Sequence, residues 1–207
     1  MTRISKPPEE RRAEFVETAA RLFDEIGYAA CSVERIIREI GVAKGTFYYH
    51  FTSKPEVLAA VVEQKLDAIV ETARHVADLP GIPAIEKMRM LLGGLADDES
   101  RALAERMHRP ENRELHELTN VRTVLRLSPV IADVVRQGVA EEVFAVDRPL
   151  ETVQLLLTGA QFLADEGLFE ATPEELAARR RAIATTIERA LGAAPGSFAF
   201  MTGETDP

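Results

Sequence analysis

The chain has 207 residues and 46% of them are hydrophobic, which is enough for one large or two modest domains with a buried core. Its single cysteine, Cys31, excludes an intrachain disulfide and a cysteine metal cluster, and no run of 18 apolar residues marks a membrane span. The net charge is −9. The first residues lack the apolar segment of a signal peptide, so we expect a cytoplasmic protein with no membrane partner.

The acidic charge is concentrated in the later and larger part of the chain. Residues 1–54 carry nine Lys or Arg and eight Asp or Glu, whereas residues 55–207 carry 16 and 26. A polyanion such as duplex DNA repels acidic surfaces and attracts basic ones. The distribution therefore fits a nearly neutral region that can approach a polyanion, attached to an acidic body that is held away from it.

The first predicted element is an amphipathic helix over residues 9–26. Phe15, Leu22, Phe23 and Ile26 fall on one face at helical spacing, together with Ala19. Gly27 follows and favours the end of the helix.

Residues 32–54 predict two short helices joined by a tight turn. Ser32 can cap the first helix, whose apolar stripe starts at Val33 and includes Ile36, Ile37 and Ile40, and Gly41 ends it. In the second helix, residues 44–51, Phe47 and Phe51 share one buried side. The groups that this helix turns outward are Lys44, Gly45, Thr46, Tyr48, Tyr49 and His50. Such groups donate to phosphates and contact base edges in a major groove, although buried aromatics with solvated polar neighbours would also explain them.

The rest of the chain predicts helix after helix. Ser53 and Glu56 suggest a capping box for a long helix that ends near Ala77 and connects the first three helices rigidly to the body. Pro80 follows that helix, and Pro129 is expected to kink a later one. We predict further helices over 83–95, 97–108, 111–138, 149–166 and 173–191, and a loose tail from residue 193, apart from Phe198 and Phe200.

The beginning of the chain resembles the DNA-binding domain of the TetR family of transcriptional repressors (TetR/AcrR type), over about residues 10–60. The residues that carry the resemblance are Ala20 to Phe23, Gly27, Ile36, Gly41, Val42, Lys44, Gly45, Thr46, Tyr48, His50, Phe51, Ser53, Lys54 and Leu58. Beyond them only the layout is similar. In one place the chain departs from the family: Glu142-Val143-Phe144 stands where relatives often have a glycine shortly before a phenylalanine.

The resemblance implies an all-α fold of about nine helices. A three-helix helix-turn-helix head over residues 1–54 would bind DNA, and a helical body over residues 55–207 would bind an effector and dimerise. The resemblance implies DNA contacts from Ser32, Val33, Lys44, Gly45, Thr46, Tyr48, Tyr49, His50 and Lys54. The expected partners are a double-stranded operator with an inverted repeat, a second copy of the chain and an unidentified small molecule.

Two apolar helices near the end of the chain suggest the dimer interface. Residues 149–166 are apolar nearly all round, and residues 173–191 carry an apolar stripe, so that two copies can form a four-helix contact. Packing within a monomer would produce the same pattern. The candidate interface residues are Leu156, Gly159, Leu163, Ile183, Ile187 and Leu191.

The effector site is expected between residues 83 and 138, where methionines and leucines supply an adaptable apolar lining. Arg113 or Arg122 would balance the charge of an anionic effector, unless both lie on the surface. His108 and His116 allow a metal site, but satisfied or solvated histidines are the simpler reading, and we predict neither metal nor cofactor. The candidate lining residues are Met88, Leu92, Met107, His108, Asn112, His116 and Asn120.

The sequence therefore predicts a dimeric repressor that a small molecule releases from its operator. An alternative is a DNA-binding adaptor that recruits another protein without sensing a ligand. A third reading, an all-α enzyme, lacks support because no nucleophile, base and orienting acid occur at a telling spacing, and no glycine-rich loop for phosphate is present.

Overall fold

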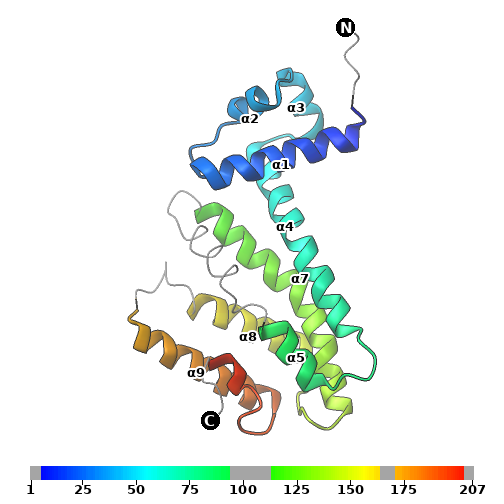
Figure 1. Cartoon of the computed structure of the whole chain (residues 1–207), viewed down its shortest axis with the longest axis vertical. Helices are drawn as coiled ribbons and strands as arrows, with labels where there is room; N and C mark the ends of the chain where they lie inside the picture. Colours follow the sequence, from blue (N-terminus) through cyan, green and yellow to red (C-terminus); the bar gives the residue numbers. More distant parts are fainter. Residues whose placement is uncertain (1–5, 94–112, 164–170, 203–207) are drawn as a thin grey trace.

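The protein consists of a small helical head joined to a longer helical body (Figure 1). The computed structural model describes residues 6–93, 113–163 and 171–202. Within these ranges there are α-helices, one short 3₁₀ helix and no strand, which confirms the all-α prediction, and none of these helices is long and apolar enough to span a membrane. The helix expected over 97–108 lies outside them. In chain order the elements are α1 (Pro8–Ile26), α2 (Val33–Ile40), α3 (Lys44–His50), α4 (Lys54–Ala77), α5 (Ala84–Gly93), α7 (Arg113–Ala140), α8 (Pro149–Leu163), α9 (Pro173–Leu191) and η3 (Ala199–Thr202).

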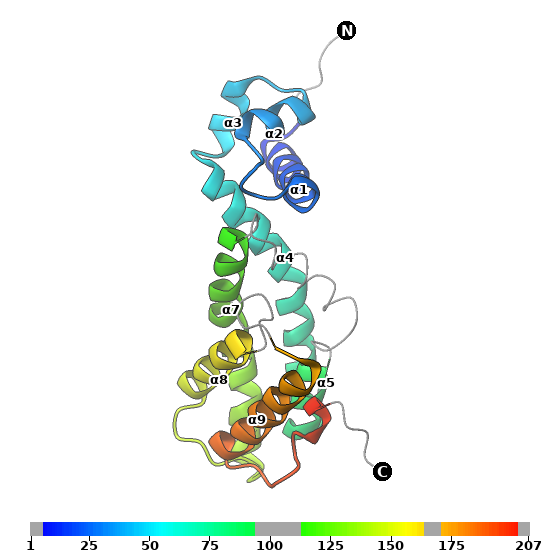
Figure 2. The same ribbon diagram turned by 90° about the vertical axis from the view of Figure 1, so that its left-hand side faces the viewer.

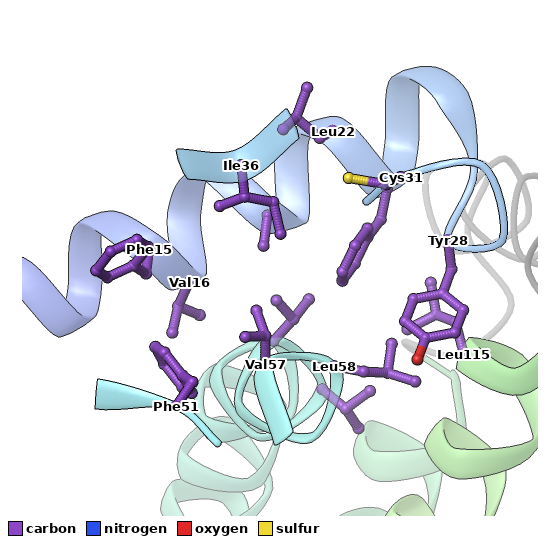
Figure 3. Close-up of a cluster of buried hydrophobic side chains, with 14 of the residues drawn as sticks. Phe15, Val16, Leu22, Tyr28, Cys31, Ile36, Phe51, Val57, Leu58 and Leu115 are labelled. Carbon is purple, nitrogen blue, oxygen red and sulfur yellow. The ribbon is translucent and has the colours of Figure 1, made fainter. Parts of the chain in front are cut away.

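Aromatic side chains close the core of the head, as the close-up in Figure 3 shows. Phe15 of α1 meets Phe47 edge to face, with ring centroids 5.4 Å apart, and Phe51 in the same way at 6.1 Å. Ile36 brings α2 onto the same core, and all four side chains are fully buried. Ile26, predicted on the buried face of α1, is instead exposed because it is the last residue of the helix and the chain turns away at Gly27.

Local hydrogen bonds fix the first turns of α2 and α4. Ser32 Oγ accepts a hydrogen bond from Arg35 N at 3.1 Å, as predicted for the cap of α2. Ser53 Oγ likewise accepts one from Glu56 N at 3.4 Å. The Glu56 carboxylate accepts one from Thr52 N at 2.6 Å, one residue before the position that a capping box would use.

Helix α4 belongs to both the head and the body, and it runs beside α7 (Figures 1 and 2). Its buried residues up to Leu66 pack in the head core, and those from Val70 onward pack in the body core. On the outside, Arg126 of α7 pairs with Glu63 at 2.9 Å and with Asp67 at 2.8 Å. These contacts hold the connecting helix against the body along its middle turns.

The first turn of α7 also touches the head. Leu115 is buried in the head core, below Tyr28 in Figure 3. Burial raises the pKa of Tyr28, and the nearby Glu114 raises it further through its charge and a side-chain hydrogen bond. The head is therefore attached to the body at two places, through α4 and through the start of α7.

At its other end α7 stops in a Schellman motif, in which two backbone bonds turn the chain back. Val143 N donates to Gly138 O at 2.9 Å and Glu142 N donates to Val139 O at 3.1 Å. Glu142 occupies the left-handed position of this motif, with φ of +60°. Phe144 then packs so closely on Gly138 that a Cβ at residue 138 would lie 2.1 Å from its ring.

The segment after α9 packs back onto the body. This confirms the exception made for Phe198 and Phe200, whereas the expectation of a loose tail is wrong for Ala193 and Met201, which pack on the same core. Phe198 is fully buried, and its ring stacks on Phe144 with centroids 6.4 Å apart. The Phe198 N–H donates to Glu188 Oε1 at 3.0 Å. The guanidinium of Arg89 on α5 lies 5.0 Å from the ring centroid of Phe200. Burial of aromatic surface thus fixes a segment whose Gly and Pro content suggested a loop.

Candidate nucleic-acid interface

Helix α3 has one buried and one exposed side. Phe47 is fully buried, and Phe51 at the C-terminal cap is 1% exposed, which fixes the rotation of the helix on the head. As a result Tyr48 and Tyr49 point outward and are 48% and 75% exposed. Gly45 is exposed on the first turn and leaves room for a partner to approach the backbone. We call the exposed groups of Lys44, Gly45, Tyr48 and Tyr49 the recognition face.

The other two α3 candidates are less accessible. Thr46 is half-buried, and so is His50, whose ring packs between Phe15 at 5.8 Å and Tyr49 at 4.9 Å between centroids. Burial lowers the pKa of His50, and the positive charges of Arg11 and Arg12 on α1 lower it further. His50 therefore favours the neutral form in the free protein.

Ser32 and Val33 occupy the start of α2, where free backbone N–H groups favour phosphate. Ser32 is exposed although its hydroxyl caps the helix. The side chain of Val33 instead packs against the head core and is half-buried. Any contact of Val33 with DNA must therefore come mainly from its backbone N–H, because its side chain is packed against the head core.

Lys54 begins α4 beside the loop that follows α1. Its ammonium lies 4.0 Å from the ring centroid of Tyr28 and 3.4 Å from Ala29 O. These contacts orient a half-buried side chain whose charge can still meet an anion. The phosphate contact expected for Lys54 thus has a preorganised donor.

One charged residue on this surface, Glu34 of α2, was not predicted. Its carboxylate pairs with Lys44 at 3.2 Å, so it lies beside the recognition face. The signal was available, since Glu34 comes two residues after the cap Ser32 and lies outside the apolar stripe of α2, on its flank.

The described effector candidates do not gather at one place. Met88 is buried in the body core and Leu92 packs against that core, whereas His116 follows the head contact of Leu115. His116 Nε2 and Asn120 Nδ2 lie 2.7 Å apart on adjacent turns of α7. The candidates outside the described residues are Met107, His108 and Asn112.

The two arginines considered for an anionic effector are engaged on the surface. Arg113 pairs with Glu117 at 3.5 Å, and Arg122 pairs with Glu63 of α4 at 3.3 Å. Within the ranges that the structure describes, no group of three or more His, Cys, Asp or Glu side chains is placed to hold a metal ion. Neither arginine is therefore placed in the interior of the described part of the body, where Lys87 is the buried charged side chain and its ammonium donates to Gln137 Oε1 at 2.8 Å.

The predicted interface residues divide into exposed and buried ones. Ile187 and Leu191 are buried within the protomer, because α9 turns this side toward the body core. Leu156 and Ile183 are half-buried against the same core, whereas Gly159 and Leu163 are exposed.

The exposed stripe of α8 contains two residues that were not predicted. Leu155 is 75% exposed and Phe162 is 50% exposed, and with Gly159 they follow the spacing of one helix face. The same spacing is present in the sequence, but a helix that is apolar nearly all round does not show which side its own protomer covers.

Both parts of the chain match family models. Residues 15–61 match the model of bacterial regulatory proteins of the tetR family, and residues 96–186 match the tetracyclin repressor-like C-terminal domain. The uncharacterized HTH-type transcriptional regulator YerO of Bacillus subtilis is 31% identical over 90 residues, which are 43% of this chain and 31% of YerO. An HTH-type transcriptional regulator of Staphylococcus aureus strain USA300 is 34% identical over 75 residues, or 36% of this chain and 40% of that protein. The chain thus spans less than half the length of these relatives.

Solved structures share the whole fold at low identity. The structure of RolR in complex with the ligand resorcinol has a TM-score of 0.63 and 17% identity, covering 97% of this chain and 96% of RolR. A TetR-family transcriptional regulator from Pectobacterium atrosepticum has a TM-score of 0.60 and 24% identity, covering 89% of this chain and 95% of that one. The helical head and body of the structure agree with the two family models that the sequence matches. The chain therefore belongs to the TetR family of bacterial transcriptional regulators.

Proposed function

We propose that this regulator is a repressor that binds a palindromic operator as a homodimer and leaves it when a small molecule binds to the body. The observation that carries the proposal is the recognition face. Two tyrosines and a lysine stand outward on a seven-residue helix whose other side is locked by Phe47 and Phe51. Exposing two large aromatic side chains to water alone is unfavourable, whereas in a major groove the same side chains can contact base edges.

Groups near the recognition face can contact the sugar–phosphate backbone of DNA. The start of α2 at Ser32 and the ammonium of Lys54 flank α3, and both favour phosphate oxygens. Phosphate contacts position a protein on the duplex, whereas the groups of α3 select the sequence. We place the boundary of the DNA-binding region after Lys54 and assign residues 55–207 to the effector and dimerisation body.

A homodimer accounts for the exposed stripe of α8. Leu155 and Phe162 are too large and too exposed to be explained by packing within the protomer, and Gly159 between them permits a close approach of a second helix. An isologous contact of this stripe with its copy, flanked by α9, buries it and places two heads on one side of the dimer. Two heads related by a two-fold axis match an inverted repeat.

The structural similarity to RolR, which was solved with the ligand resorcinol, supports a small-molecule effector, and we assign its binding to the helical body that contains Met88. The regulator then acts in the cytoplasm, where the chromosome is, and needs no catalytic group. An effector lowers operator affinity only if it binds more tightly to the arrangement of heads that does not fit DNA. The contacts of α4 and of Leu115 with the head supply the mechanical connection between effector and head.

The test is a selection of bound sequences from a pool of random duplexes with the purified protein. We expect enrichment of an inverted repeat whose half-sites are about one or more helical turns apart. The variant Tyr49→Ala should lose part of the enrichment, whereas Tyr28→Phe, which keeps the buried ring under Lys54, should retain it. A pool with no enriched inverted repeat would refute the proposal.

A further inference from the structure

Glu34 and Lys44 form an exposed ion pair at the edge of the recognition face. Lys44 Nζ donates to Glu34 Oε1 at 3.2 Å, and the two side chains are 62% and 59% exposed. Lys44 Nζ also lies 5.8 Å from the ring centroid of Tyr48. A carboxylate from the first turn of α2 is therefore placed beside the first residue of the helix that we assign to the major groove.

The carboxylate of Glu34 is held in its ionised form. Its own backbone N–H at the start of α2 lowers its pKa most, and the hydrogen bond and charge of Lys44 lower it further. An ionised carboxylate is an acceptor only. Next to DNA phosphates it is repelled unless it meets a donor, and the donors that a major groove offers are the amino groups of cytosine and adenine.

We propose that Glu34 and Lys44 together recognise one C·G base pair in each operator half-site. The Glu34 carboxylate accepts from the N4 amino group of cytosine, and the Lys44 ammonium donates to O6 and N7 of the paired guanine. This inference rests on the proposed function, because it requires α3 to enter the major groove. It adds Glu34 to the DNA-contacting residues and assigns a base pair to it.

The complementarity follows from the order of groups along the base-pair edge. In the major groove a C·G pair presents the cytosine donor next to two guanine acceptors, and the ion pair presents an acceptor next to a donor. A T·A or A·T pair gives the ammonium fewer acceptors and adds the thymine methyl group. The reversed G·C pair brings the guanine acceptors against the carboxylate, which is repulsive.

A second glutamate of α2 provides the contrast. Glu39 pairs with Arg21 of α1 at 2.8 Å and with Arg35 at 3.4 Å. These partners hold Glu39 between α1 and α2, where its hydrogen-bonding capacity is used within the head. Glu39 carries the same charge on the same helix and is the matched control.

The experiment compares selections from random duplexes by the wild type, Glu34→Ala, Glu34→Gln and Glu39→Ala, each checked for its fold by thermal melting. We expect one cytosine column in the wild-type half-site. In Glu34→Ala the preference at that column should fall about tenfold or more, while the other columns remain. Glu34→Gln should shift the column from cytosine to adenine, because an amide can accept from adenine N6 and donate to N7. Glu39→Ala should leave every column unchanged.

Three results would overturn the inference. An inverted repeat whose columns are the same in the wild type and in Glu34→Ala would mean that Glu34 only anchors Lys44. An equal loss in Glu39→Ala would assign the effect to a change in the head as a whole. If the wild type enriches no repeat at all, the proposed function fails, and this inference fails with it.

Discussion

The head and the body of this protein obtain their order in different ways. The head is small, and most of its core comes from the first 66 residues, so Phe15, Phe47 and Phe51 determine which groups of α3 face outward. The body consists of long helices, and which sides are covered depends on neighbours far along the chain, such as Phe198 on Phe144. A local pattern therefore suffices to locate the functional surface of the head, whereas the surfaces of the body are decided by tertiary packing.

The largest effect should come from charges in the α8 stripe. Leu155→Glu with Phe162→Glu would bury four carboxylates in a dimer, and each unpaired buried charge costs about 3–5 kcal/mol. We expect a folded monomer that no longer binds its inverted repeat, as measured by sedimentation and circular dichroism. Leu191→Glu is the matched contrast, because Leu191 lies in the protomer core and its charge should unfold the body. A wild type that sediments as a well-folded monomer at micromolar concentration would contradict the dimer.

The head should depend on single aromatic residues. Phe47→Ala removes a fully buried ring that contacts Phe15 and Phe51, and such changes cost about 3–5 kcal/mol. We expect a matching decrease in the free energy of unfolding, measured with urea, and a loss of DNA binding. Tyr49→Ala on the exposed side should change the free energy of unfolding by less than about 0.5 kcal/mol. Equal losses in the two variants would show that α3 is not rotated as described.

Two kinds of DNA contact should separate by their sequence dependence. Tyr48→Ala should alter the ranking of sites, with each lost base contact costing about 1–3 kcal/mol. Lys54→Ala should weaken binding to all duplexes alike and decrease the slope of log affinity against log salt by about 1. Fluorescence anisotropy at several salt concentrations measures both. A Lys54→Ala variant that changes the ranking of sites would remove the phosphate role from this lysine.

The coupling free energy between ligand binding and operator binding should be similar to the cost of one lost base contact, or smaller. A molecule that fills the body should weaken operator binding by about 1–3 kcal/mol, and operator should weaken its binding equally. Small phenols and apolar acids can be screened by their effect on the melting temperature and then titrated against the DNA complex. If every stabilising molecule leaves operator affinity unchanged, the body does not sense a ligand, and the alternative of a DNA-binding adaptor that recruits another protein gains support.

The sequence was informative where a residue's role is local. Ser32, Gly41 and Ser53 are helix-end residues whose chemistry acts within four residues, and the helices begin and end at them as predicted. Residues 149–166 gave no such information, because a helix with apolar residues on all sides is compatible with either face being buried. The exposed side chains Leu155 and Phe162 were therefore not singled out, and the burial of Ile187 and Leu191 of α9 within the protomer likewise depends on tertiary packing. Phe198 could be excepted from the loose tail as a large aromatic, but its partner Phe144 lies 54 residues earlier and could not be identified from the local sequence.

The smallest predicted effect tests the one departure from the family pattern. Glu142 adopts a φ of +60° in the Schellman motif of α7, whereas the caps of α2 and α9 use Gly41 and Gly192 at φ of +74° and +64°. A left-handed conformation costs a residue with a Cβ about 1–2 kcal/mol, and replacement by glycine removes this cost. Glycine also loses more conformational entropy on folding, which offsets the stabilisation by about 0.5–1 kcal/mol. Glu142→Gly should therefore stabilise the protein by about 0.5–1 kcal/mol in urea unfolding. The control Ala140→Gly, at the end of the helix proper, should destabilise it by up to about 1 kcal/mol. A destabilised Glu142→Gly would show that the side chain of Glu142 stabilises the turn by more than its backbone strain costs.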